Sequence, residues 1–207
     1  LQGPQSVTFG ANSANIVHPF FAANSATAEK RLRGYGTDNG RWERYRFSDG
    51  GQVNGIATVK MTMTEGDAGS GPDSTEHMWF AQDTEGNVHF LKRSEEGEAF
   101  LIGVGAGRAP AWFLPADPTA EPWASGRPWF TFGGMIKMRV LAINASKHGR
   151  NDLLKCQFIS DDNGALRFDG RFSGVDDRDD LYYAPDDSLW FEVYNDGGEV
   201  NGFARVQ

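Results

Sequence analysis

The sequence predicts an all-β fold: a curved antiparallel sheet or half-barrel from two hairpin-rich halves, with room for one short helix. The first observation is composition, because 26 glycines and 13% aromatic residues in 207 are typical of strands joined by tight turns. The second is that runs of alternating aromatic or β-branched residues recur along the chain. The third is that segments with Asp or Asn before Gly separate these runs. Together they favour antiparallel hairpins over helix bundles.

Four segments are expected to be hairpin turns, because Asp or Asn can hydrogen-bond the local backbone and Gly supplies a positive φ angle. The first is SDGG at Ser48, between RWERYRF and VNGIATVKMTM. The second is DTEGN at Asp83, between EHMWFAQ and NVHFLKR. SDDNG at Ser160 and NDGG at Asn195 are the third and fourth. These turns predict four antiparallel strand pairs.

Two segments differ from this pattern. SATAEKRLRG, from Ser25 to Gly34, has a serine at its start, two alanines and a terminal glycine, and it is the candidate for the short helix. Residues 103–128 are rich in proline and tryptophan and lack regular periodicity, so they are expected to form a crossover loop rather than a central strand. The chain is therefore predicted to be a single β domain, with a first half at about 16–102 and a second half at 129–207.

A twelve-residue segment occurs twice in similar form. DGGQVNGIATVK begins at Asp49 and DGGEVNGFARVQ begins at Asp196, and eight of the twelve positions are identical. In both copies small and β-branched residues alternate, which suits a curved strand packed closely against bulky neighbours. We interpret the repeat as scaffold that marks equivalent strands in the two halves, with chance similarity between two hairpins as the alternative.

Charge and cysteine content narrow the classes of partner and chemistry. The net charge of -8 and the pI of about 5.0 argue against nucleic acid and anionic membrane surfaces, which bind clustered Lys and Arg. No stretch is apolar enough to span a membrane. Cys156 is the single cysteine and alternates with Leu154 and Phe158, so a buried, structural thiol is expected.

The hairpin MWFAQDTEGNVHFLKR, from Met78 to Arg93, resembles the motif WYAQDxxGNVWY of a family of exported bacterial hypothetical proteins and lipoproteins. HPFF near His18, VNGIATV, APAWFLPADP and YYAPDDSLWFEV resemble further segments of that family, in the same order. Leu91-Lys92 and Asp186 depart from its pattern. The family has no assigned activity. The resemblance implies a periplasmic or secreted location and, by analogy, a curved sheet like those of lipoprotein carriers. The residues that correspond to the hairpin motif are Trp79, Phe80, Ala81, Gln82, Asp83, Gly86, Asn87 and Val88.

No motif indicates a cofactor, a metal or a catalytic centre. The four histidines are scattered, and HExxH, CxxC and GxSxG are absent from the sequence. The weak candidate for a calcium site is Asp176, Asp177 and Asp179 in DDRDD, against a solvated acidic loop as the alternative. No cofactor is expected.

Aromatic side chains are the candidate ligand-binding residues. They are expected either to line an apolar or carbohydrate-stacking cleft or to plug one open end of the curved sheet. The candidates are Trp79, His89, Trp112, Phe113, Trp123 and Trp129.

Three functions remain open at the level of sequence. The first is a non-enzymatic extracytoplasmic protein that holds a small apolar molecule or a glycan on the concave face of its sheet. The second is an enzyme acting on an exported polysaccharide, for which Glu76, Asp83 and Glu192 are conceivable carboxylates, although Asp83 also suits a role in capping its own turn. The third is a structural or accessory component of an envelope complex. The oligomeric state is left open.

Overall fold

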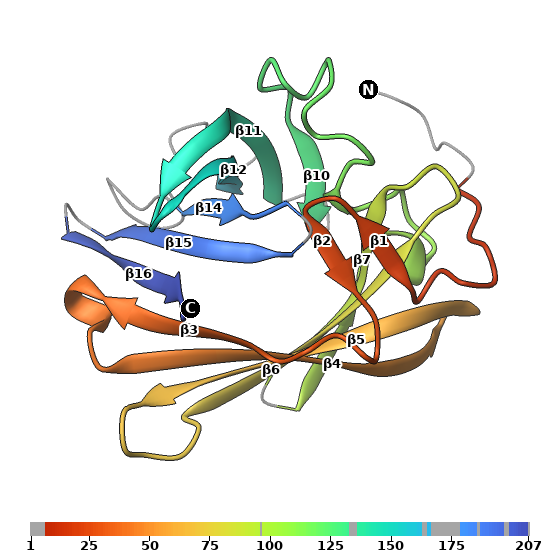
Figure 1. Ribbon diagram of the computed structural model, residues 1–207. Coiled ribbons are helices and arrows are strands. Elements are labelled where there is room, and N and C mark those ends of the chain that lie inside the picture. Colours follow the sequence, from red (N-terminus) through yellow and green to blue (C-terminus); the bar gives the residue numbers. More distant parts are fainter. Residues whose placement is uncertain are drawn as a thin grey trace.

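Strands dominate the computed structural model, and fourteen of them form one large antiparallel sheet (Figure 1). The structure describes residues 7–95, 97–132, 136–162, 165–166, 179–185, 187–196 and 199–206. The sheet curves but does not close, which confirms the predicted curved antiparallel sheet. The described residues contain two short 3₁₀ segments and no α-helix.

The first half of the chain contributes one continuous meander to the sheet. A separate small hairpin of β1 (Ile16–His18) and β2 (Phe21–Ala23) precedes it. A 3₁₀ turn, η1 (Gly36–Asp38), joins the first two strands of the meander. The strands, in sheet order, are β3 (Lys30–Tyr35), β4 (Arg41–Val53), β5 (Ile56–Asp67), β6 (Ser74–Gln82), β7 (Val88–Glu95) and β8 (Glu98–Leu101).

The second half contributes the remaining strands. Its sheet order follows the chain, except that β13 (Ala165–Leu166) pairs off the path with β12. The strands on the path are β10 (Trp129–Phe132), β11 (Ile136–Lys147), β12 (Arg150–Asp162), β14 (Asp180–Tyr183), β15 (Leu189–Asp196) and β16 (Glu199–Arg205).

The last strand of the chain joins the two halves. β16 pairs antiparallel with β3, and Figure 1 shows the two side by side near the C-terminus. Asp187 stabilises the pairing of β16 with β3, because its carboxylate accepts hydrogen bonds from Lys30 on β3 and from Arg205 on β16. The concave interior therefore lies between strands from both halves of the chain.

The crossover also adds a strand. Residues 103–128 begin with the 3₁₀ segment η2 (Gly103–Ala106), and β9 (Trp112–Leu114) then pairs with the start of β7. Val88 and His89 are the β7 residues in this pairing. Because β9 lies at the edge of the β7 ladder, it agrees with the expectation that this proline-rich segment supplies no central strand.

The predicted helix at Ser25–Gly34 is wrong. Lys30–Tyr35 form β3 instead, in which Leu32 and Gly34 are buried while Arg31 and Arg33 are exposed. This alternation has the period of a strand, and β3 has hydrogen-bonded neighbours on both sides, β4 and β16. Pairing within the sheet outweighs the local helix propensity of the sequence.

The two copies of the repeat occupy different positions in their hairpins. In the first copy β4 continues through SDGG with a bulge, and the turn is formed by Asn54 and Gly55, whose φ angles are 50° and 77°. In the second copy β15 ends at Asp196, and Asn201 and Gly202 lie within β16. Gly202 is needed there for close approach, because a Cβ atom would stand 2.1 Å from the Glu192 carbonyl oxygen. The two copies are therefore not the equivalent strands that the sequence predicted, and the turn predicted at Ser48 lies six residues later.

The hairpins predicted at Asp83, Ser160 and Asn195 are confirmed. β6 ends at Gln82 and β7 begins at Val88, while β12 pairs with β13 through Asp162 and Ala165. Asp196 pairs with Glu199 in the last hairpin. An Asp/Asn-Gly segment therefore predicts a hairpin turn correctly where it lies directly between two strands that pair with each other.

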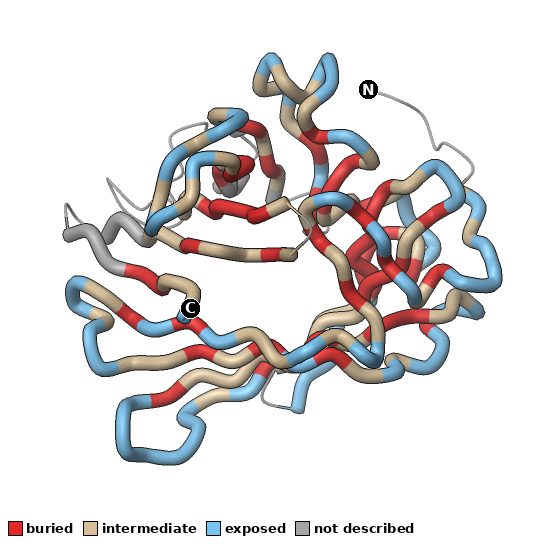
Figure 2. Tube along the Cα trace, in the orientation of Figure 1, coloured by how far each residue is buried: buried red, intermediate tan, exposed pale blue. Residues whose placement is uncertain are grey.

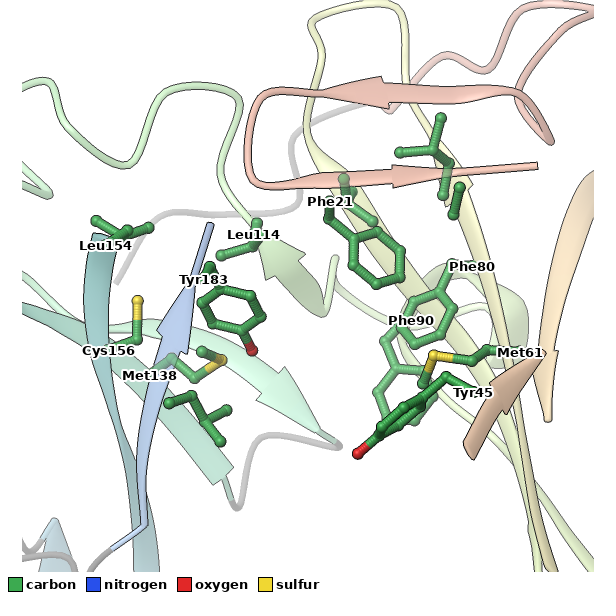
Figure 3. Close-up of a cluster of buried hydrophobic side chains, with 14 of the residues drawn as sticks. Phe21, Tyr45, Met61, Phe80, Phe90, Leu114, Met138, Leu154, Cys156 and Tyr183 are labelled. Carbon is green, nitrogen blue, oxygen red and sulfur yellow. The ribbon is translucent and has the colours of Figure 1, made fainter. Parts of the chain in front are cut away.

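The largest hydrophobic cluster lies on the concave side of the sheet. Figure 2 shows buried positions along the strands and exposed ones in the peripheral loops. One group of core side chains comes from the first half and includes Phe21, Phe80 and Phe90, and another comes mainly from the second half and includes Tyr183 (Figure 3). Cys156 belongs to the second group and is fully buried, as expected of a structural thiol, and burial raises the pKa of this thiol.

Candidate functional site

A cavity of about 340 Å³ lies between the two groups of core side chains. Strands of both halves, the β1–β2 hairpin and the crossover strand β9 all contribute to its wall. A volume of this size is at the lower end of the range of about 300–1,000 Å³ that is usual for small-molecule sites. The cavity is therefore the candidate functional site.

Most of the cavity wall is apolar. On β4 and β5 the strand alternation turns every second side chain inward, so that Tyr45 and Phe47 lie beside Met61 and Met63. Figure 3 shows the Tyr183 side chain pointing from β14 toward the group that contains Phe90. Methionine adapts its shape to what it contacts, so a methionine-rich wall suits a ligand of irregular outline. The apolar lining residues are Phe21, Tyr45, Phe47, Met61, Met63, Met78, Phe90, Phe113, Leu181, Tyr183 and Leu189.

The rest of the wall carries polar and charged groups. Arg93 on β7 donates a hydrogen bond to Glu76 on β6, and the Arg93 side chain is 34% exposed. Asp179, Ser188 and Glu192 line the opposite side, from the strands β14 and β15 and the segments that precede them. The cavity thus combines an apolar body with a small number of charged groups, as ligand sites commonly do.

A further carboxylate, that of Glu43, contacts the Tyr45 hydroxyl. The Tyr45 hydroxyl donates a 2.8 Å hydrogen bond to Glu43, which is only 2% exposed. The pKa of Glu43 is raised to about 7, chiefly by burial and to a smaller extent by Glu65 on the adjacent strand, while the hydrogen bond from Tyr45 opposes the rise. This carboxylate therefore gains or loses its proton near neutral pH.

Of the six predicted ligand-binding residues, Phe113 lines this cavity. Trp112, Trp123 and Trp129 pack on one another instead, with centroid separations of 5.6 Å and 5.9 Å in edge-to-face geometry. Trp129 is 3% exposed and donates a 3.4 Å hydrogen bond to the carbonyl oxygen of Phe113. The tryptophans thus pack the crossover against the core of the sheet and do not line the cavity.

Trp79 and His89 project from the other face of the sheet. On β6, Met78 and Phe80 point to the cavity and core, so the intervening Trp79 lies on the opposite face. Its indole donates to the Gly50 carbonyl oxygen, and the Lys92 ammonium lies 4.3 Å from its ring centroid. These two residues are not part of the cavity wall.

Asp83 organises the hairpin that carries His89. One carboxylate oxygen accepts hydrogen bonds from the backbone N–H groups of Glu85 and Asn87, and the other accepts from the Asn87 side chain and, at 2.7 Å, from His89. Burial alone would raise the pKa of Asp83, but the hydrogen bonds from His89 and Asn87 outweigh it and lower this pKa. This arrangement confirms the expectation that Asp83 caps its own turn, and it occupies His89 in a structural contact.

The acidic segment contributes one residue to the cavity. Asp179 lines it, whereas the other two calcium candidates, Asp176 and Asp177, lie outside the described residues. Among the described residues, no three His, Cys, Asp or Glu side chains gather closely enough to hold a metal ion. The calcium candidate stays a prediction.

The sequence interpretation missed the methionines. Met61 and Met63 alternate with threonines in KMTMT, and Met78 follows His77 on the next strand. The threonine Thr62 faces away, where its hydroxyl lies 3.0 Å from Nδ1 of His77. Alternation of flexible apolar with small polar residues in a long strand was the available signal for one wall of an interior site.

Comparisons of the chain with protein-family models, with curated proteins and with solved structures find no match. Within the described residues, no helix is both long and apolar enough to cross a membrane.

Proposed function

We propose that the protein binds a small apolar molecule in the cavity between the two halves of its sheet, without catalysing a reaction on it. The observation that carries this proposal is the wall, in which aromatic and methionine side chains from β2, β4, β5, β6, β7, β9 and β14, with Leu189 from β15, surround a space of about 340 Å³. Burying apolar ligand surface against such a wall contributes about 25 cal/mol per Å².

The cavity favours an apolar ligand over a glycan. Carbohydrate stacking uses exposed, flat aromatic faces, and the tryptophans expected to provide them pack on one another or project from the opposite sheet face. Phenylalanine edges and methionine methyl groups offer few hydrogen bonds to a sugar. The supported ligand is therefore a compact hydrophobic molecule.

The two alternative functions gain less support. Two acidic side chains converging on His89 in the cavity would support an enzyme. His89 is instead fully buried and hydrogen-bonded to Asp83, away from the cavity. An accessory role in an envelope complex would gain from a broad exposed aromatic patch. The extracytoplasmic location is proposed with the binding function, from the resemblance of the Asp83 hairpin alone.

Fluorescence titration with 1-N-phenylnaphthylamine, an uncharged apolar probe, tests the proposal. We expect saturable enhancement with one site per chain, and loss of this enhancement in Met63→Trp, which fills the cavity from β5. Thr64→Trp is the matched control, because Thr64 lies on the same strand and faces the other way. Equal probe binding by both variants, with both still folded by circular dichroism, would contradict the proposal.

A further inference from the structure

The strands β3 to β7 carry basic side chains on the face that points away from the cavity. On β4, Tyr45 and Phe47 line the cavity, so the alternate residues Arg44 and Arg46 lie on the outer face. The pairing registers extend this outer face to the neighbouring strands, because residues directly opposite each other share a face. Its basic residues are Arg31 and Arg33 on β3, Arg44 and Arg46 on β4, Lys60 on β5 and Lys92 on β7.

The acidic residues of these strands alternate onto the opposite face. The structure describes every residue of β3 to β6, and each Asp and Glu on these four strands lies on the side of Tyr45 and Met61. These acidic residues are Glu43, Asp49, Glu65, Asp67 and Glu76. The outer face of the four strands is therefore basic, although the whole chain has a net charge of -8.

The basic side chains of the outer face are accessible and only partly paired. Glu29, which precedes β3, accepts hydrogen bonds from Arg31 and Arg46. The side chains of these two arginines nevertheless remain 64% and 67% exposed. Among the described residues, no carboxylate forms a salt bridge with the other four basic side chains, which are Arg33, Arg44, Lys60 and Lys92.

One pair on this face has a cost for the sheet. Arg31 and Arg44 lie directly opposite each other on β3 and β4. Like charges in a cross-strand pair destabilise a sheet, so the stability of the fold does not explain this pair. An anionic group bound between the two guanidinium groups would remove the repulsion.

We propose that this outer face binds an anionic polysaccharide, at a site separate from the cavity and independent of the function proposed for it. The basic residues extend over four strand spacings from β3 to β7, and over six positions along β4 from the partner of Arg33 to the partner of Lys60. Standard strand dimensions give about 20 Å in each direction. A single small anion would match few of these cations, whereas a chain with repeated carboxylate or sulfate groups contacts several.

Hydroxyl side chains of the same face suit the sugar rings of such a chain. They lie opposite the basic and aromatic residues in the pairing register, so they can hydrogen-bond the hydroxyl groups of the polysaccharide between its charged groups. These residues are Ser48, Thr62, Thr64, Thr75 and Ser94.

Single-stranded nucleic acid matches this face less well. Proteins that bind it stack its bases on accessible aromatic rings. On this face the Arg44 guanidinium lies 4.5 Å from the ring centroid of Trp42, and the Lys92 ammonium lies 4.3 Å from that of Trp79. A base would have to displace these cations, whereas a carboxylate or sulfate group can bind them where they lie.

Fluorescence anisotropy with fluorescein-labelled polygalacturonate and dextran sulfate tests the proposal at neutral pH. The first probe is carboxylated and the second is sulfated, so the two distinguish the sources of negative charge. We expect saturable binding of at least one probe in about 50 mM NaCl and several-fold weaker binding in about 200 mM NaCl, because bound cations release counterions from a polyanion. Unlabelled neutral dextran should not compete.

The double variant Arg33→Gln/Lys60→Gln should weaken binding about tenfold, since it removes two solvent-screened charge contacts. Arg127→Gln/Lys137→Gln is the matched control, with the same loss of charge, and should bind as the parent does. Arg127 lies in the crossover and Lys137 on β11, and Figure 1 shows β11 far from β4 and β5. Circular dichroism checks that both variants fold. The single variants, each expected to lose about threefold, replace the double variant if it does not.

The outcomes separate this proposal from its alternatives. It is overturned if neither anionic polysaccharide binds, or if the control variant loses as much affinity as the double variant. It is also overturned if labelled oligothymidylate or phosphatidylglycerol vesicles bind this face more tightly than both polysaccharides, because the partner is then of another class. The apolar-probe titration reports on the cavity separately, so either proposal can fail while the other stands.

Discussion

The ring of Phe21 lies against the ring of Phe113, with 4.9 Å between their centroids. Phe21 belongs to the β1–β2 hairpin and Phe113 to the crossover strand, and both line the cavity. Phe113 also contacts Phe80, at 5.0 Å, and Tyr183, at 6.0 Å, so it touches core residues from both halves of the sheet. One crossover residue thus joins the separate hairpin and the two halves around the site.

Phe113→Ala should lower the free energy of unfolding by about 3 kcal/mol, because truncating a packed Phe removes its burial and its ring contacts. Urea denaturation followed by tryptophan fluorescence measures this change. Phe130→Ala is the control, since Phe130 is 42% exposed on β10 and its truncation should cost less than about 1 kcal/mol. Similar losses for the two variants would show that Phe113 does not join the halves as described.

Glu43 should make the protein less stable as the pH rises. Its pKa is about 7 in the fold against an ordinary value of 4.5, so the unfolded chain releases this proton at lower pH than the folded chain does. The cost is absent below pH 4.5, grows between the two pKa values and is complete above about 7, where it reaches on the order of 3 kcal/mol.

Glu43→Gln should remove that loss and should be more stable than the parent protein at pH 8 and above. Urea denaturation at a series of pH values measures this difference. Glu65, Arg41 and Asp38 carry charges that act on Glu43, so Glu65→Gln is the matched comparison and should leave most of the pH dependence in place. A parent protein whose stability is flat from pH 4.5 to 8 would refute the assignment.

Asp83→Ala should destabilise the β6–β7 hairpin by about 3 kcal/mol, because four donors, one of them on buried His89, lose a charged acceptor. Since the pKa of Asp83 is lowered in the fold, its contribution is present above its ordinary pKa and is lost as the pH falls through the folded value. Denaturation at neutral and at acidic pH measures both effects. Asp73→Ala is the exposed control. A variant as stable as the parent at neutral pH would show that the hairpin does not need this acceptor.

The fold could be predicted from sequence where local chemistry and sheet pairing agree. In the Asp83 hairpin the turn residues, the alternation and the capping side chain all specify the same structure. At Ser48 two turn signals compete six residues apart, and Asn54-Gly55 forms the turn because both residues adopt positive φ angles. At Ser25–Gly34 helix propensity is opposed by pairing with β4 and β16, partners that lie far away in sequence.

The cavity could be predicted only in outline. Aromatic residues at the crossover were recognised, and Phe113 does line the cavity, but Trp112, Trp123 and Trp129 pack against one another. The curvature of the sheet decides which side chains of β6 face the cavity. The alternation of Met78 and Trp79 alone does not specify this curvature. The wall from β14 and β15 comes from residues that lie more than eighty positions further along the chain than those of β6 and β7.

Methyl NMR of the methionines tests whether the apolar probe binds in the cavity. With [¹³C-methyl]methionine labelling, we predict that 1-N-phenylnaphthylamine gives intermolecular NOEs to the methyl groups of Met61, Met63 and Met78, which line the cavity. Met138, fully buried in the core and outside the cavity wall, is the internal control and should give none. Saturable probe binding without any NOE to the three cavity methionines would place the ligand elsewhere and contradict binding in the cavity.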